Sequence, residues 1–233
     1  MKLTFITCAV VSALALTGCN DNKNTAPVEK LNKQAVARSA NTETQSQEDI
    51  SVLYTQATQA IFKERALEAT MFGLSSEKVG KEFSDQLADF SPDNEAKLRQ
   101  QLAILSKKIS TYNLSQATST DIDNQQVMAG ITQYFAGHKD FSIGYIDAWM
   151  GLSPFIVNQI NGPLIDIPRI MQNDQAITTE QEALDYIARL GKFDTMIASI
   201  EEKLAFDAAQ NWLPPKSTVT GALRYLKGFI SAE

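Results

Sequence analysis

The stretch Ser91–Tyr112, SPDNEAKLRQQLAILSKKISTY, decides the fold class. Serine followed by proline is a typical helix start, because proline at the first helical position loses no backbone hydrogen bond. Apolar side chains then recur at spacings of four, three, four and three residues, at Leu98, Leu102, Leu105, Ile109 and Tyr112. Such a stripe forms one face of a helix and suits packing against another helix. We therefore expect an all-α domain of about six to seven helices.

Two further helices are predicted before this segment. Ser46 and Asp49 resemble an N-terminal capping pair, and Gly73 is a plausible end for the helix that follows. Its apolar positions are Ile50, Leu53, Tyr54, Ala57 and Ile61. A shorter helix is expected from Ser76 to about Ala88, and its inward residues would be Val79, Phe83 and Leu87.

Four helices are predicted after it. Thr120 and Asp123 would cap a helix with Val127, Ile131 and either Tyr134 or Phe135 as its apolar residues. A short helix would follow Gly162-Pro163 and run to about Gln172. Thr179 and Glu182 form a capping box that opens the longest helix, about Glu180 to Asn211, which ends before Pro214-Pro215. Its inner face would contain Leu184, Ile187, Leu190, Ile197, Ile200 and Leu204. The last helix, about Ser217 to Ile230, would carry Val219, Leu223, Leu226 and Ile230.

Residues 137–161 interrupt this periodicity. The segment combines three glycines with a proline and several aromatic residues, which predicts an irregular connection with short helical turns at most. The sequence shows no convincing strand hairpin and no internal repeat.

The N-terminus predicts export and lipid attachment. Lys2 precedes an apolar run of about fourteen residues, Leu3 to Leu16, which is short for a membrane span and typical of a signal peptide. The run ends in Leu16-Thr17-Gly18-Cys19, which resembles the lipobox of bacterial lipoproteins, with cleavage between Gly18 and Cys19 and acylation of Cys19. The alternatives are an ordinary cleaved signal peptide and an apolar helix with an incidental cysteine. Asn20, rather than aspartate, follows the cysteine, which favours the outer membrane.

Three segments follow from these patterns: a signal peptide at 1–18, the lipidated Cys19 with a disordered linker at 19–48, and a helical domain at 49–233. The linker is mostly polar and small, and it has too little apolar surface to form a core. The formal net charge is −6, without a basic cluster, which argues against nucleic acid as a partner. The expected partner is a lipid bilayer, through the acyl chains on Cys19.

Few residues offer chemistry. His138 is the single histidine, and both cysteines, Cys8 and Cys19, lie in the first nineteen residues, so no zinc site of the His-Glu-x-x-His type can form. We expect His138 to be a solvated turn residue. Glu64 and Glu68, four residues apart, could pair for metal or acid–base work, but a solvated charged face is the simpler interpretation. No catalytic residue, metal ligand or cofactor is therefore assigned.

The segment Asn158-Gln159-Ile160-Asn161-Gly162 is of more interest. Asn158 and Gln159 beside Gly162 could bind a peptide backbone or fix their own loop, and the second interpretation is favoured.

Several segments together resemble one family. They are Glu68–Leu74, Asp85–Pro92, Asn158–Gly162, Tyr186–Leu190 and Trp212–Lys216. In order and rough spacing, over about residues 50–230, they are similar to the N-terminal portion of bacterial lipoproteins catalogued as domain of unknown function 885. The resemblance implies a mainly helical fold and, for longer members, a zinc-dependent peptidase with His-Glu-x-x-His in the second half.

Two functional hypotheses remain open. The chain would be the non-catalytic part of a zinc-metallopeptidase-like lipoprotein, truncated or split from its catalytic half, and it would then expose apolar helix faces. Alternatively, it is a self-sufficient helical binding or scaffold lipoprotein of the cell envelope. Zinc is implied only for full-length members of the family.

Overall fold

The computed structural model describes residues 49–115 and 117–231, and it is predominantly helical. The helices are α2 (Ile50–Glu64), α3 (Ala66–Met71), α4 (Ser76–Val79), α5 (Pro92–Ser110), α6 (Ser119–Ala136), α7 (Pro163–Asn173), α8 (Glu180–Leu190), α9 (Phe193–Ala209) and α10 (Lys216–Ile230). The predicted all-α class is confirmed. Gly18 and Cys19 lie outside the described residues, as do Ser46 and the predicted linker.

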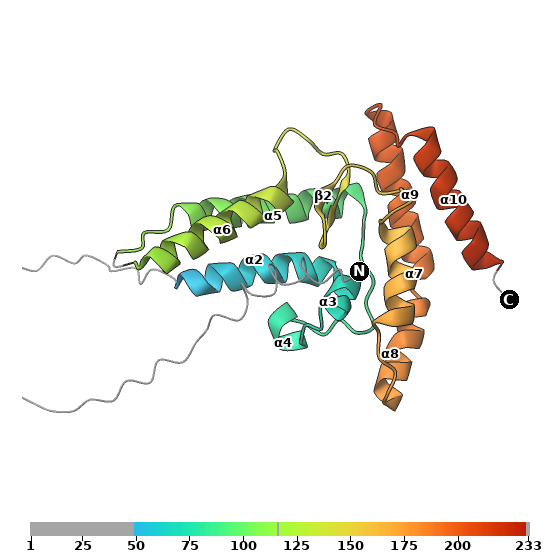
Figure 1. The fold of residues 1–233 in the computed structure, drawn as a ribbon, viewed down its shortest axis with the longest axis horizontal. Coiled ribbons are helices and arrows are strands. Elements are labelled where there is room, and N and C mark those ends of the chain that lie inside the picture. Colours follow the sequence, from blue (N-terminus) through green and yellow to red (C-terminus); the bar gives the residue numbers. More distant parts are fainter. Residues whose placement is uncertain (1–48, 116, 232–233) are drawn as a thin grey trace, which may run out of the picture. The chain divides into compact units, whose positions relative to one another are not determined.

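Helix α5 lies between α2 and α6 in the first part of the body (Figure 1). Its predicted stripe is buried, and the exposed fractions are 2% for Leu98, 0% for Leu102 and 0% for Ile109. Ala57 and Ile61 of α2 join the same core cluster. At about 25 cal/mol per Å² of buried apolar surface, this stripe is a main stabilising element of the three helices.

The second core cluster lies among α3, α7 and α9. It contains Leu67, Ile167, Ile170, Met196 and Ile200. Figure 1 shows α7 to α10 as a second group of helices that runs across the direction of α2, α5 and α6.

A hairpin that the sequence analysis did not predict joins the two clusters. Strand β1 (Tyr145–Asp147) pairs antiparallel with β2 (Gly151–Ser153), with Ile146 opposite Leu152. Ile146 belongs to the first cluster and Tyr145 to the second, because neighbouring strand residues point to opposite sides. The hairpin was missed because strands of three residues are too short to show alternation.

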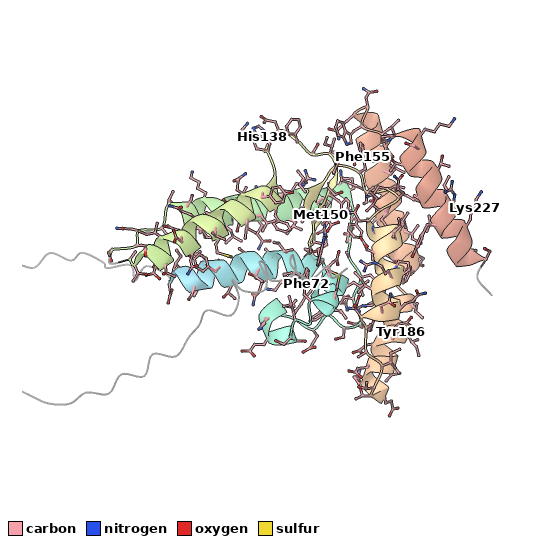
Figure 2. All side chains as sticks on the ribbon, viewed as in Figure 1. Phe72, His138, Met150, Phe155, Tyr186 and Lys227 are labelled. Atoms are coloured by element: carbon pink, nitrogen blue, oxygen red, sulfur yellow. The ribbon has the colours of Figure 1, made fainter. Side chains whose placement is uncertain are left out.

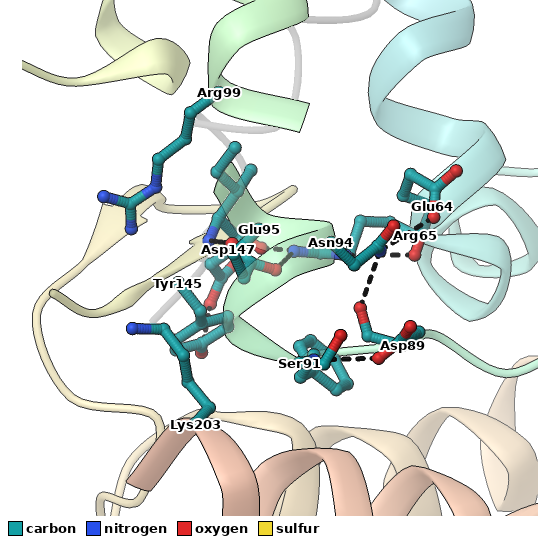
Figure 3. Close-up of polar contacts among 12 residues, drawn as sticks. Glu64, Arg65, Asp89, Ser91, Asn94, Glu95, Arg99, Tyr145, Asp147 and Lys203 are labelled. Atoms are coloured by element: carbon teal, nitrogen blue, oxygen red, sulfur yellow. Dashed lines mark hydrogen bonds and ion pairs between the residues drawn. The ribbon is translucent and has the colours of Figure 1, made fainter. Parts of the chain in front are cut away.

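Buried cations hold this connecting segment in place. Arg65 and Glu95 form an ion pair at 0% and 1% side-chain exposure, and together they bind both backbone groups of Ile146 (Figure 3). The Arg99 guanidinium donates to the carbonyls of Phe141 and Ile143 at 2.9 and 2.8 Å. These side chains satisfy carbonyls that no regular ladder reaches, which is why an irregular segment can be buried.

A second buried pair acts on the same segment from α9. Lys203 Nζ donates to Asp207 Oδ1 at 2.5 Å and to the Ser142 carbonyl at 3.0 Å. Asp207 Oδ2 accepts the Gly144 amide at 3.1 Å. Gly144 has φ of 68°, and a Cβ there would lie 2.1 Å from the Ser153 carbonyl oxygen, so only glycine fits.

Several expected boundaries were wrong. The first helix breaks at Arg65, whose side chain turns toward Glu95 and Ile146. Asp49 caps its start by accepting the Ser51 amide. Gly73, with φ of 63°, ends α3 as predicted. The helix expected from Ser76 to Ala88 is the single turn α4, because Gly80 is left-handed there. Val79 and Phe83 are nevertheless buried, while Leu87 is partly buried.

The cap and inner face of α6 also differ from the prediction. The capping box is Thr118 with Asp121, two residues before the predicted pair of Thr120 and Asp123. Its buried residues are Ala129, Thr132 and Ala136. Phe135 packs against the first cluster, whereas the other predicted apolar residues, Val127, Ile131 and Tyr134, are exposed.

The predicted long helix from Glu180 to Asn211 is two helices. The Thr179–Glu182 capping box opens α8 as expected, but α8 ends at Leu190, and α9 starts at Phe193 after the Gly191-Lys192 turn. Only the later part of the predicted inner face points inward, at Ile200 and Leu204. Leu184, Ile187, Leu190 and Ile197 are exposed.

Candidate functional site

The candidate site lies where the hairpin meets the Asn158–Gly162 loop. Asp147 ends β1 and is 6% exposed. Its Oδ1 accepts the backbone amides of Trp149 and Met150 at 2.8 and 2.9 Å. Its Oδ2 accepts hydrogen bonds from the Tyr145 hydroxyl at 3.2 Å and from the side-chain Nδ2 of Asn161 at 3.0 Å. Four donors fill the acceptor sites of one carboxylate. Asp147 therefore holds the hairpin turn to the loop and is not free to bind a ligand.

Asn158 and Gly162 bond within their own loop. Asn158 Oδ1 accepts the amides of Ile160 and Asn161 at 2.9 and 2.8 Å, which is an Asx turn. Gly162 has φ of 106° and donates its amide to Asp166 Oδ2 at 2.9 Å, at the start of α7. In this arrangement the two residues shape the loop, and their polar groups are already in use.

Gln159 faces outward, toward α10. An open pocket of about 780 Å³ lies here, and its lining consists of Gln159, Lys216, Ser217, Thr220, Gly221 and Arg224. A Cβ on Gly221 would lie 2.7 Å from the Gln159 Cβ, so the glycine permits the close approach of loop and helix. Of the three residues singled out from the sequence, Gln159 is the one that could touch a ligand.

Glu68 is a chemically distinctive group that the sequence analysis interpreted as solvated. It lies in α3, whereas Glu64 ends α2 and accepts a hydrogen bond from Asn94 at 3.0 Å, so the two do not form a pair on one helix. Burial, opposed by the attraction of Arg65 and assisted by the charges of Asp147 and Asp166, raises the pKa of Glu68 to about 7. A carboxyl group with such a pKa can exchange a proton near neutral pH.

Aromatic side chains pair between the end of α3 and the hairpin turn. Phe72 stacks on Trp149 of the hairpin turn, with ring centroids 5.9 Å apart. Trp149 and Met150 are 55% and 54% exposed. Nothing in the sequence indicated this proximity, because residues 72 and 149 come together only through the buried Arg65–Glu95 pair and the hairpin.

The remaining sequence candidates lie apart from this site. His138 follows α6 on an exposed turn, where its Nδ1 accepts the Asp140 amide at 3.3 Å (Figure 2). Within residues 49–115 and 117–231, no group of three or more His, Cys, Asp or Glu side chains could hold a metal ion. In the same residues, no helix combines the length and the apolar character that crossing a bilayer requires.

Comparison with known proteins now identifies the family. Residues 67–233 match the model of the family described as "Bacterial protein of unknown function (DUF885)", and the chain belongs to this family. A solved structure of a protein from Colwellia psychrerythraea, described there as a lipoprotein, is 61% identical, with a TM-score of 0.76. The match takes in 78% of this chain and 31% of that one, so this chain spans about a third of the solved relative's length. No match is found among curated proteins.

The resemblance found in the sequence is thereby confirmed. Family membership and likeness to a lipoprotein support an envelope lipoprotein of unknown function. The family segments Asp85–Pro92 and Tyr186–Leu190 meet in the structure, where Arg189 donates to the Gln86 carbonyl at 2.8 Å.

Proposed function

We propose that this chain is a lipid-anchored lipoprotein of the bacterial cell envelope whose helical body is the non-catalytic N-terminal part of a zinc-metallopeptidase-like fold. One observation carries the proposal: Leu16-Thr17-Gly18-Cys19 stands ahead of a body that is 61% identical to a lipoprotein three times its length. The acyl chains on Cys19 would provide the anchor, since several chains together hold a protein on a bilayer far better than one. Asn20 favours the outer membrane, facing the periplasm.

The assignment to a non-catalytic part rests on the zinc ligands that this sequence lacks. The peptidase activity that the family resemblance implies needs two histidines and a carboxylate on zinc, and this sequence has one histidine. That histidine, His138, is exposed and bonds to its own turn. In this proposal the hairpin and loop region, with Glu68, supports or borders the cleft of a catalytic half.

A second candidate is a self-sufficient binding or scaffold lipoprotein. The open pocket beside Gln159 favours it, because Lys216 and Arg224 line the pocket together with hydroxyl groups of α10. Binding of a small anion by the chain alone, lost in Arg224→Gln, would support this alternative over the first proposal.

Three measurements test the main proposal. Mass spectrometry of the protein from native cells should find the chain starting at an acylated Cys19, and Cys19→Ser should remain unprocessed. Membrane fractionation should place the wild-type protein in the outer membrane. A peptide-cleavage assay should show no chelator-sensitive activity for the purified chain. An unacylated cytosolic protein would overturn the anchoring, and chelator-sensitive cleavage would overturn the non-catalytic role.

A further inference from the structure

Helix α8 is held with a charged residue inward. Arg189 is the buried residue of α8 and is 0% exposed. Its guanidinium donates to the carbonyls of Gln86 and Phe83 at 2.8 and 2.9 Å, to Gln175 Oε1 at 2.8 Å and to Thr70 Oγ1 at 3.1 Å. These four acceptors come from three segments of the chain and fix the rotation of α8 about its axis, since turning the helix would leave a buried cation without partners.

The opposite face of α8 is apolar and exposed. Leu184, Ile187 and Leu190 are 54%, 63% and 48% exposed, and we call them the outer stripe of α8. At 100° per residue, Ile187 and Arg189 lie on opposite sides of the helix. Burial of apolar side chains is favourable, so a rotated α8 would gain stability by burying the stripe. The anchored Arg189 prevents that rotation, and the stripe stays available to another surface.

Helix α10, at the end of the described residues, also carries exposed apolar side chains. Leu223 and Ile230 are 50% and 82% exposed, while Val219 and Leu226 of the same four-residue stripe are partly buried. Among the residues of α10 whose burial the structure describes, Ala222 is the buried apolar one. Two amphipathic helices, which α9 separates in the chain, thus present apolar side chains outward, and exposed apolar patches of this kind are typical of an interaction surface.

The length of the solved relative indicates what covers these faces. At 61% identity the relative has the same helices, and 69% of its chain lies outside the match. That polypeptide is large enough to cover both stripes. An anionic lipid surface fits less well, because α8 begins with Glu180 and Glu182 and continues with Asp185.

We propose that the outer stripe of α8 and the stripe of α10 are the docking surface for the part of the family fold that lies outside this chain's match. The proposal rests on the proposed function, which it deepens by naming the contact face. The partner surface would present apolar side chains to Leu184, Ile187 and Leu223, and Arg189 would act as the positioning residue that keeps α8 turned outward.

The test compares one position in two proteins. Ile187→Cys is placed in the full chain with Cys8→Ser and Cys19→Ser, so that it is the single thiol. The same substitution is made in a chimera, called the swap below. In it, the matched residues of this chain replace the corresponding residues of the Colwellia lipoprotein, and the rest of that protein is kept. We expect maleimide to label the Ile187→Cys thiol at least tenfold more slowly in the swap. Gln101→Cys, at an exposed position of α5, is the matched control and should react equally in both.

Two outcomes would overturn the proposal. Equal labelling of the Ile187→Cys thiol in the chain and in a folded swap would show that the remaining polypeptide does not cover α8. Slow labelling in the chain alone, together with a dimer by light scattering, would assign the face to a second copy. If the swap does not fold, the aligned position in the unaltered relative gives the same readout. The assay needs neither acylation nor peptidase activity, so its failure is distinct from failure of the proposed function.

Discussion

Helices α5 and α8 carry similar apolar stripes in the sequence and use them in opposite ways. The stripe of α5 is buried between α2 and α6, with Leu102 at 0% exposure. The stripe of α8 faces outward, and its inward residue is Arg189. The comparison shows that apolar periodicity identifies a helix face that needs a packing partner. The direction in which that face points depends on contacts made by other residues of the helix. For α8 a buried cation decides it.

The largest expected effect comes from the pair that fixes the hairpin to α5. Arg65→Met should lower the free energy of unfolding by about 3–5 kcal/mol, because Glu95 would remain buried without its counter-charge. Chemical denaturation measures the loss. Arg65→Met with Glu95→Leu should regain much of it, since the uncompensated charge is then gone. A single variant as stable as the wild type would contradict the role assigned to the pair.

A direct comparison of the two stripes comes next. Leu102→Ala should cost about 2–5 kcal/mol of unfolding free energy, because it leaves a cavity in a core that lies between two helices. Leu184→Ala, the same chemical change on α8, should stay within about 0.5 kcal/mol of the wild type. Thermal unfolding of both variants checks the contrast. Equal losses would mean that α8 already buries its stripe in solution.

The pH dependence of stability should reveal Glu68. Its pKa is about 7 in the folded state and near 4.5 when unfolded, so the folded protein keeps a proton that the unfolded chain loses. Stability should therefore fall as pH rises from about 4.5 through 7, by roughly 1–3 kcal/mol. Glu68→Gln should remove this loss above pH 7 and change little at pH 4.

Glu182 provides a matched control with the opposite sign. Hydrogen bonds from Thr178 lower its pKa to about 2, so its stabilising effect is present above the unfolded pKa and is lost as pH falls toward 2. Glu182→Gln should therefore destabilise the protein at neutral pH. If both glutamine variants shift stability in the same direction, the environment inferred for Glu68 is wrong.

The smallest effect concerns the start of α8. Thr179 Oγ1 accepts the Glu182 amide at 3.2 Å. Thr179→Ala should cost about 1 kcal/mol, and Thr179→Ser should cost little, because serine keeps the capping oxygen. Denaturation midpoints distinguish the two. Equal midpoints for the two variants would show that the capping oxygen does not stabilise α8.

Local signals predicted the parts of the fold that depend on local chemistry. Ser91-Pro92 began α5, and Thr179 with Glu182 began α8, as expected. The start of α6 failed for an identifiable reason: Thr118 with Asp121 and Thr120 with Asp123 are overlapping copies of one pattern, and the sequence does not choose between them.

The site was less predictable than the helices, because it depends on contacts between residues far apart in the chain. The segment with Glu64 and Glu68 was interpreted as a solvated charged face, yet Arg65, which lies between them in the chain, is fully buried against Glu95 and Ile146. Arg189 is likewise a helical arginine that the structure places in the interior, at 0% exposure. Neither position differs in sequence pattern from an exposed arginine on a helix, and only the carbonyls that surround it in the fold distinguish it.

Strand β1 has a consequence for cooperativity. Tyr145 and Ile146 are neighbours in the chain that pack into different core clusters. Unfolding of one cluster would therefore displace β1 and expose the β1 residue that is buried in the other cluster. Calorimetry should therefore record one transition for residues 49–231 rather than two. The Ile146 amide, bonded to Glu95 at 2.9 Å, should exchange its hydrogen only when the whole body opens.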